Sequence, residues 1–157
     1  MKNILVFGAG AIGRGYVPWL FDLSVYALDF VEKDTTLISE LESQGIYSTF
    51  MTKEGTYEKK DVPINKIYQI NMVTPEIVDE YDFVITAVGP RQFMGLSEIF
   101  KKTSTPIICF ENDRNLVGFM KTATGRSNIF FGIPDVITPS SSSKELERDY
   151  KNCLITE

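Results

Sequence analysis

Short apolar runs alternate along this chain with longer stretches in which apolar and polar residues are mixed. The runs that predict strands are Ile4–Phe7, Val25–Val31, Phe83–Val88, Pro106–Phe110 and Ile129–Phe131. Runs of this length, rich in Val and Ile, are typical of strands that are buried on both faces, as in parallel sheets. Their alternation with helical stretches predicts an α/β protein built on a doubly wound, mostly parallel sheet.

Helices are expected between these runs. The first is predicted by apolar residues at helical spacing, which are Ile12, Tyr16, Trp19 and Leu20. Pro18 predicts a bend in this helix near Arg14, because proline removes one backbone donor, but not a break. Later helices are predicted over Leu37 and Leu41 up to a stop at Gly45, from Thr74-Pro75, over Arg91–Lys102 and from about Asn115.

A β-hairpin is predicted near residues 46–63, inserted into the α/β pattern. Ile46–Thr52 and Thr56–Pro63 are rich in strand-forming residues, and Lys53-Glu54-Gly55 joins them as a turn. The second arm is mostly polar, so we expect it to be exposed or at an edge, and the hairpin to have no direct function. Shorter segments are predicted as strands at 66–71 and 153–155 and as a loop at 140–143.

The first strand runs directly into a glycine motif, Gly8-Ala9-Gly10-Ala11-Ile12-Gly13. In a strand-to-helix turn of this spacing, the first glycine allows the tight turn, the second allows close approach of a pyrophosphate, and the third lets the helix pack on the strand. Backbone N–H groups at the helix start would face the phosphates. We therefore predict that Gly8, Gly10, Ala11, Ile12 and Gly13 bind a dinucleotide; the alternative is a glycine turn that binds nothing.

An acidic residue is expected at the end of the second strand, where it would bind the ribose hydroxyls of the dinucleotide. Glu32 lies 19 positions after Gly13, at about the required distance along the chain. Asp29 lies within the strand, and Asp34 precedes a helical stretch as an N-cap would. Glu32 is therefore the predicted ribose ligand, against the alternative of an ordinary exposed acid.

Two further strand ends carry candidate site residues, because ligands of open parallel sheets bind beyond the carboxyl ends of the strands. Thr86, Ala87, Val88 and Gly89 are expected beside the cofactor, although a plain strand-to-helix turn would have the same sequence. Asn112 follows the next strand. It is predicted either to donate a hydrogen bond to a substrate oxygen or nicotinamide amide, or to cap the following helix.

Composition narrows the possible functions. The chain has 157 residues, which predicts one domain, and 43% of them are hydrophobic. A net charge of −5 without a basic stripe argues against nucleic acid and anionic membrane surfaces as partners. There is no histidine, so the commonest general base and metal ligand is missing, and no metal site is predicted. Two cysteines, no signal peptide and no membrane-spanning run make the cytoplasm the expected location.

From its glycine motif onward, the sequence resembles the long-chain polyol (mannitol) dehydrogenases. The matching segments are FGAGAIGRG at 7–15, DFVITAVGP at 82–90, Glu111-Asn112 and the stretch from Pro134-Asp135 to Pro139. The resemblance spans essentially the whole chain and implies a Rossmann-type NAD-binding domain over residues 1–157. It places Gly8, Gly10 and Gly13 at the pyrophosphate, Glu32 at the ribose and 86–89 along the cofactor. It also matches Asn112 to an asparagine that helps polarise the reacting carbonyl or alkoxide.

The chain departs from the family in two respects. It has Asp135-Val136 where Asp-Arg is typical, and it ends at Glu157, about where a helical second domain begins. In the family that domain supplies a catalytic lysine. We therefore expect the cofactor-binding half of an NAD-dependent polyol or polyol-phosphate oxidoreductase, whose small-molecule substrate binds with the absent domain. The alternatives are a stand-alone NAD(H)-binding or sensing module and a Rossmann fold without ligand. Turnover by this chain alone would require a base among Lys121, Asp135 and Glu111.

Overall fold

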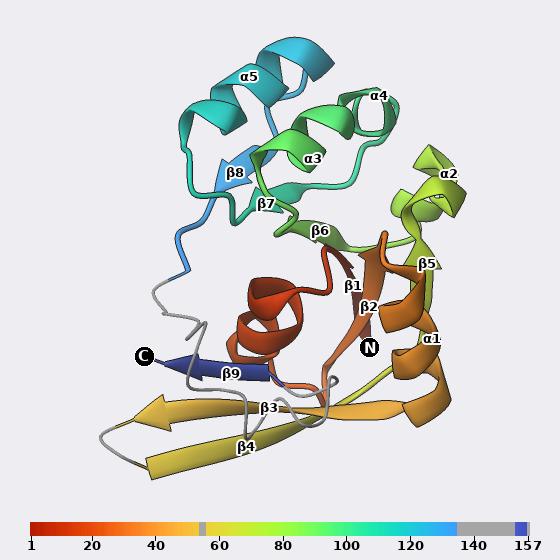
Figure 1. The fold of residues 1–157 in the computed structure, drawn as a ribbon. Coiled ribbons are helices and arrows are strands. Elements are labelled where there is room, and N and C mark those ends of the chain that lie inside the picture. Colours follow the sequence, from red (N-terminus) through yellow and green to blue (C-terminus); the bar gives the residue numbers. More distant parts are fainter. Residues whose placement is uncertain (54–55, 135–152, 157) are drawn as a thin grey trace.

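A computed structural model describes residues 1–53, 56–134 and 153–156 (Figure 1). Its main sheet has six strands in the order β5-β2-β1-β6-β7-β8, and every neighbouring pair is parallel. These strands are β1 (Lys2–Phe7), β2 (Tyr26–Glu32), β5 (Ile67–Gln69), β6 (Phe83–Thr86), β7 (Ile107–Cys109) and β8 (Ile129–Phe131). The predicted doubly wound, Rossmann-type sheet is confirmed.

The core is organised around β1, which is buried on both faces. Ile4 and Val6 belong to one hydrophobic cluster, whereas Leu5 and Phe7 belong to the cluster on the opposite face. The chain leaves β1 for β2 on one side and returns to β6 on the other. The sheet therefore changes winding direction between β1 and β6, and the crevice of such a sheet lies beyond the carboxyl ends of these strands.

Five α-helices are seen in the described part of the chain: α1 (Thr35–Gln44), α2 (Pro75–Val78), α3 (Pro90–Gly95), α4 (Ser97–Phe100) and α5 (Asn115–Thr124). The helices α3, α4 and α5 cover one face of the sheet, and a short 3₁₀ turn, η3 (Ile70–Met72), follows β5 (Figure 1). The predicted stop at Gly45 is confirmed by its left-handed conformation, with φ of 70°. The prediction of a single helix over 91–102 is wrong. The helix is interrupted at Leu96, directly after Gly95, because glycine is a poor helix former.

The first helix is not an α-helix. The chain forms a π-helix, η1 (Ala11–Tyr16), and then a 3₁₀-helix, η2 (Val17–Leu20). The helical path continues through Pro18, so the chain is not broken there, but the type of helix changes one residue earlier. Val17 donates to the carbonyl of Ile12, five residues back, as in a π-helix, and Pro18, the next residue, has no N–H to donate.

The predicted hairpin is confirmed. The strands β3 (Ile46–Lys53) and β4 (Thr56–Pro63) are antiparallel, and β9 (Cys153–Thr156) adds a third strand parallel to β3. As expected, β4 is an edge strand. The hairpin lies against η1, which is placed between it and the main sheet (Figure 1). Among the helices in the three described ranges, none is long and apolar enough to cross a membrane. The loop predicted at 140–143 lies outside those ranges.

Candidate functional site

The glycine motif forms a tight turn between β1 and η1. Gly8 has φ of +97°, and a Cβ atom there would overlap the backbone carbonyl of Ala87. A Cβ atom on Gly13 would overlap the carbonyl oxygen of Gly8, so only glycine lets the helix approach the strand. Gly10 differs, because a Cβ atom there would meet no atom within 4 Å. Gly8 and Gly13 are thus required by chain packing, whereas Gly10 faces open space.

Glu32 is bound to this turn. Its Oε2 accepts a hydrogen bond from the backbone N–H of Ala9 at 2.9 Å. Its Oε1 accepts from the N–H groups of Lys33 and Asp34 at 2.8 and 3.1 Å. Three backbone donors therefore hold one carboxylate at the end of β2, which fixes its orientation.

The two rival acids have structural roles. Asp29 is buried and accepts hydrogen bonds from the Tyr81 hydroxyl at 2.7 Å and from the N–H of Lys66 at 3.1 Å. Asp34 caps α1 through the N–H of Thr36 at 2.9 Å. Of the three candidates, only Glu32 lines a cleft at the carboxyl ends of the central strands.

This cleft has a volume of about 360 Å³, within the usual range for small-molecule sites. Its floor is the glycine turn, and its two walls follow β2 and β6. The lining residues are Gly8, Gly10, Val31, Glu32, Lys33, Ile70, Ala87, Val88, Gln92, Gly95 and Leu96. The site is therefore mostly apolar, with a carboxylate on one wall and a backbone turn at its base.

The wall that follows β6 is held by a buried acid that the sequence analysis named only as a possible base and not among the cofactor-binding residues. Glu111 is 3% exposed, and its carboxylate accepts from the N–H groups of Val88 and Gly89 at 3.1 and 2.8 Å. Gly89 has φ of +84°, which favours glycine. Thr86, expected beside the cofactor, is fully buried and does not line the cleft. An acid directly after an apolar strand was the available signal for Glu111.

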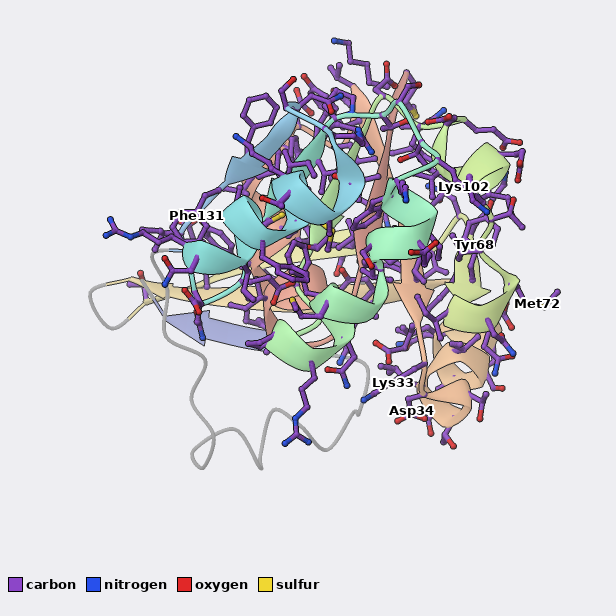
Figure 2. All side chains as sticks on the ribbon, turned by 90° about the horizontal axis from the view of Figure 1, so that it is seen from above. Lys33, Asp34, Tyr68, Met72, Lys102 and Phe131 are labelled. Carbon is purple, nitrogen blue, oxygen red and sulfur yellow. The ribbon has the colours of Figure 1, made fainter. Side chains whose placement is uncertain are left out.

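A polar contact joins the two walls near the outer edge of the cleft. Lys33 and Asp34 follow β2 and lie next to each other, with Lys33 on the side nearer α3 (Figure 2). With the Gln92 amide oriented to satisfy its neighbours, its oxygen accepts from Lys33 Nζ at 2.8 Å and its nitrogen donates to the Val88 carbonyl at 3.3 Å. Both residues line the cleft, and neither was among the site residues predicted from the sequence.

The other predicted site residues are not part of the cleft lining. Ala11 is exposed and Ile12 half-buried in the first turn of η1. Asn112 is exposed beyond β7, and Asp113 rather than Asn112 accepts the N–H of Asn115 at 2.9 Å where α5 begins. The alternative that Asn112 caps α5 therefore finds no support.

Other ionisable groups offer little chemistry at this edge of the sheet. Burial raises the pKa of the Cys109 thiol to about 12. Every lysine whose side chain is described is exposed, except Lys60, which is half-buried. No group of three or more His, Cys, Asp or Glu side chains within the described ranges could hold a metal ion. Asp135 lies outside those ranges.

Residues 2–112 match the model of the mannitol dehydrogenase Rossmann domain, which is more than half of the chain. The chain belongs to the mannitol dehydrogenase family. It is 30% identical to mannitol-1-phosphate 5-dehydrogenase of Oceanobacillus iheyensis over 93% of this chain and 44% of the relative. The enzyme of the same name from Mycoplasma pneumoniae is 24% identical over 86% of this chain and 38% of the relative.

This member of the mannitol dehydrogenase family thus spans less than half the length of these curated relatives. Solved structures agree on the fold. An octopine dehydrogenase bound to NADH and L-arginine aligns over 99% of this chain and 39% of its own, with a TM-score of 0.71 and 9% identity. The 2-dehydropantoate 2-reductase of Geobacter metallireducens aligns over 99% of this chain and 46% of its own, with a TM-score of 0.63 and 16% identity.

Proposed function

We propose that this chain is the NAD-binding half of a polyol-phosphate oxidoreductase of the mannitol-1-phosphate 5-dehydrogenase type. The observation that carries the proposal is the cleft itself. A backbone turn with open space at Gly10 lies below a fixed carboxylate on Glu32, at the point where the sheet changes winding direction. Family membership and the match to mannitol-1-phosphate 5-dehydrogenases support the assignment.

The residues present suit the adenosine half of a dinucleotide. The adenine ring would lie between apolar side chains on the two walls, with Val31 and Ile70 on one side and Leu96 on the other. The ribose hydroxyls would donate to Glu32, and the pyrophosphate would lie over Gly10. When bound, NAD supplies the hydride acceptor, while these residues bind and orient it.

NAD is proposed over NADP because of Glu32. A 2′-phosphate would approach a carboxylate whose oxygens are held in place by three backbone donors. Like charges at such a distance repel, and Lys33 is the lining cation that would offset the repulsion. Its amine contacts Gln92 on the opposite wall. Proteins of similar fold have been solved with NADH and with NADP⁺, so the fold alone does not set the cofactor preference. We assign this preference to the residues on the β2 wall.

Catalysis is proposed to need residues outside this chain. Oxidation of an alcohol by hydride transfer requires a base within hydrogen-bond reach of the hydroxyl. Lys121 is exposed on α5, and both oxygens of Glu111 already accept backbone N–H groups. Asn112 can polarise a substrate oxygen but cannot take its proton. The substrate polyol phosphate and the base are therefore assigned to the second half of the longer relatives.

Titration calorimetry of residues 1–157 with NAD⁺, NADH and NADP⁺ tests the proposal. We expect NAD⁺ and NADH to bind and NADP⁺ to bind at least about tenfold more weakly, a difference of 1.4 kcal/mol. An assay with NAD⁺ and mannitol 1-phosphate should show no turnover by residues 1–157 alone. It should show turnover by a longer protein in which this chain is followed by the second half found in the relatives. Lack of NAD binding would refute the proposal. Binding without activity in the longer protein would favour a stand-alone NAD(H)-binding module.

A further inference from the structure

The helix that follows the glycine turn has weak local support. Between Ala11 and Leu20 it contains Gly13, Gly15 and Pro18. In a helix interior each glycine costs about 1 kcal/mol relative to alanine, and proline about 3 kcal/mol. Pro18 also has no N–H to donate to the carbonyl of Arg14, four residues back. Contacts from elsewhere in the chain must therefore hold this helix in place.

The hairpin supplies the missing donors from β3. The buried Tyr47 hydroxyl donates to the Arg14 carbonyl at 2.7 Å, and the buried Thr49 hydroxyl donates to the Gly15 carbonyl at the same distance. These are consecutive carbonyls at the point where η1 gives way to η2. Two side chains on the same face of β3 thus bind the carbonyls of the two residues that lie three and four positions before Pro18.

The hairpin's second strand holds the end of the same helix. Lys60 on β4 donates from Nζ to the carbonyls of Pro18 at 3.0 Å and Phe21 at 3.2 Å. Its ammonium lies 5.2 Å from the centre of the Trp19 ring, and the Trp19 indole donates to the Thr49 hydroxyl at 3.2 Å. Both strands therefore contact the helix through directed polar groups as well as apolar packing.

Arg14 connects the hairpin to the glycine turn through two contacts. Its guanidinium lies 5.7 Å from the centre of the Tyr47 ring, and its Nε donates to the carbonyl of Ala9 at 2.8 Å. The N–H of Ala9 donates to Glu32. Ala9 is thus held at its carbonyl by Arg14 of η1, whose guanidinium lies beside Tyr47 of the hairpin, and at its N–H by Glu32 at the end of β2.

We propose that the hairpin is a positioning element for diphosphate binding, in which Tyr47 and Thr49 fix the glycine turn and η1. This inference rests on the proposed function and replaces the expectation that the hairpin has no direct role. A turn that recognises phosphate through backbone N–H groups gains affinity when those groups are fixed before binding. The adenosine site, in contrast, is built by the walls along β2 and β6, which Tyr47 and Thr49 do not line.

The experiment compares Tyr47→Phe and Thr49→Val, which remove a hydroxyl and keep most of the side-chain volume. Ser48→Ala is the matched control, because the Ser48 hydroxyl bonds to Asp61 within the hairpin at 2.6 Å. Dissociation constants for NAD⁺, ADP and adenosine would be measured for each protein. Amide hydrogen exchange at residues 11–16 would be measured without ligand.

Each test variant should raise the dissociation constants for NAD⁺ and ADP about fivefold, and that for adenosine less than about twofold. Exchange at residues 11–16 should accelerate by at least about fivefold, with little change in Ser48→Ala. A role in stability alone would leave the ADP-to-adenosine ratio unchanged and would overturn the inference, as would unchanged exchange in both test variants. If the unmodified chain binds neither NAD⁺ nor ADP, the proposed function fails and this inference fails with it.

Discussion

The carboxylate of Glu32 accepts the backbone N–H of Ala9 at 2.9 Å, across 23 positions of sequence. This bond joins the residue proposed to bind ribose to the turn proposed to bind pyrophosphate. A single substitution at Glu32 would therefore affect both parts of the cleft.

Glu32→Ala should weaken NAD binding and narrow the preference for NAD over NADP. Removing the carboxylate abolishes the proposed ribose contact and also the charge that repels a 2′-phosphate. The loss for NAD should be about tenfold, as for a hydrogen bond to a charged group worth 1.5 kcal/mol or more. Calorimetric titration with both cofactors measures the ratio. Asp34→Ala is the control, because it removes a neighbouring carboxylate that caps α1; an equal change in the ratio there would refute the role of Glu32.

Substitutions at two glycines of the turn should have different effects, one on NAD binding and the other on the stability of the fold. Gly10→Val places its Cβ atom where no other atom lies within 4 Å, so the fold should persist while NAD binding is lost. Gly13→Ala would put a Cβ atom into the Gly8 carbonyl, and we expect loss of stability, by more than about 2 kcal/mol. Urea unfolding and NAD titration of both variants distinguish the two effects. Full NAD affinity in folded Gly10→Val would place the ligand elsewhere.

The sequence was sufficient to predict the features whose causes are local. Apolar runs identify β1 and β6, and the glycine motif and the position of Glu32 follow from spacing along one βαβ unit. The π-helix could not be predicted, because residues 12, 16, 19 and 20 are compatible with several helix types. Tyr47, whose hydroxyl donates to the Arg14 carbonyl in this helix, lies 33 positions further along the chain.

The β6 wall was expected from residues 86–89, of which Ala87 and Val88 line the cleft, but the contacts that hold this wall were not predicted, for the same reason. Glu111 accepts hydrogen bonds from Val88 and Gly89 across 23 and 22 positions, and Gln92 contacts Lys33 from a different element, α3. The place of Glu111 directly after an apolar strand indicates the edge of the sheet at which it lies, but the sequence does not say which backbone groups it binds. Sequence patterns therefore predict the strands and the turn, whereas the contacts that fix the turn depend on tertiary packing.

Cys109 should be unreactive in the folded chain. Burial raises the pKa of its thiol to about 12, so little thiolate exists at pH 8. In a Cys153→Ser background, a thiol reagent should modify Cys109 only after unfolding by guanidinium. The free energy of unfolding should also fall between pH 9 and 12, by up to ~1.4 kcal/mol per pH unit, because the unfolded thiol releases its proton first. Cys109→Ala should reduce this slope, and fast labelling of the native protein would contradict the prediction.

Glu111 should matter for both stability and cofactor binding, because its buried carboxylate holds the loop between β6 and α3. Glu111→Ala leaves the N–H groups of Val88 and Gly89 without their acceptor, which should cost about 2–3 kcal/mol of unfolding free energy. Glu111→Gln retains one acceptor oxygen and should cost less, while NAD binding weakens in both variants as the Val88 wall shifts. Urea unfolding and NAD titration measure the two effects, with the exposed Glu98→Ala on α4 as the control. If Glu111→Ala were as stable as Glu98→Ala and bound NAD equally well, the acid would have no part in positioning this wall.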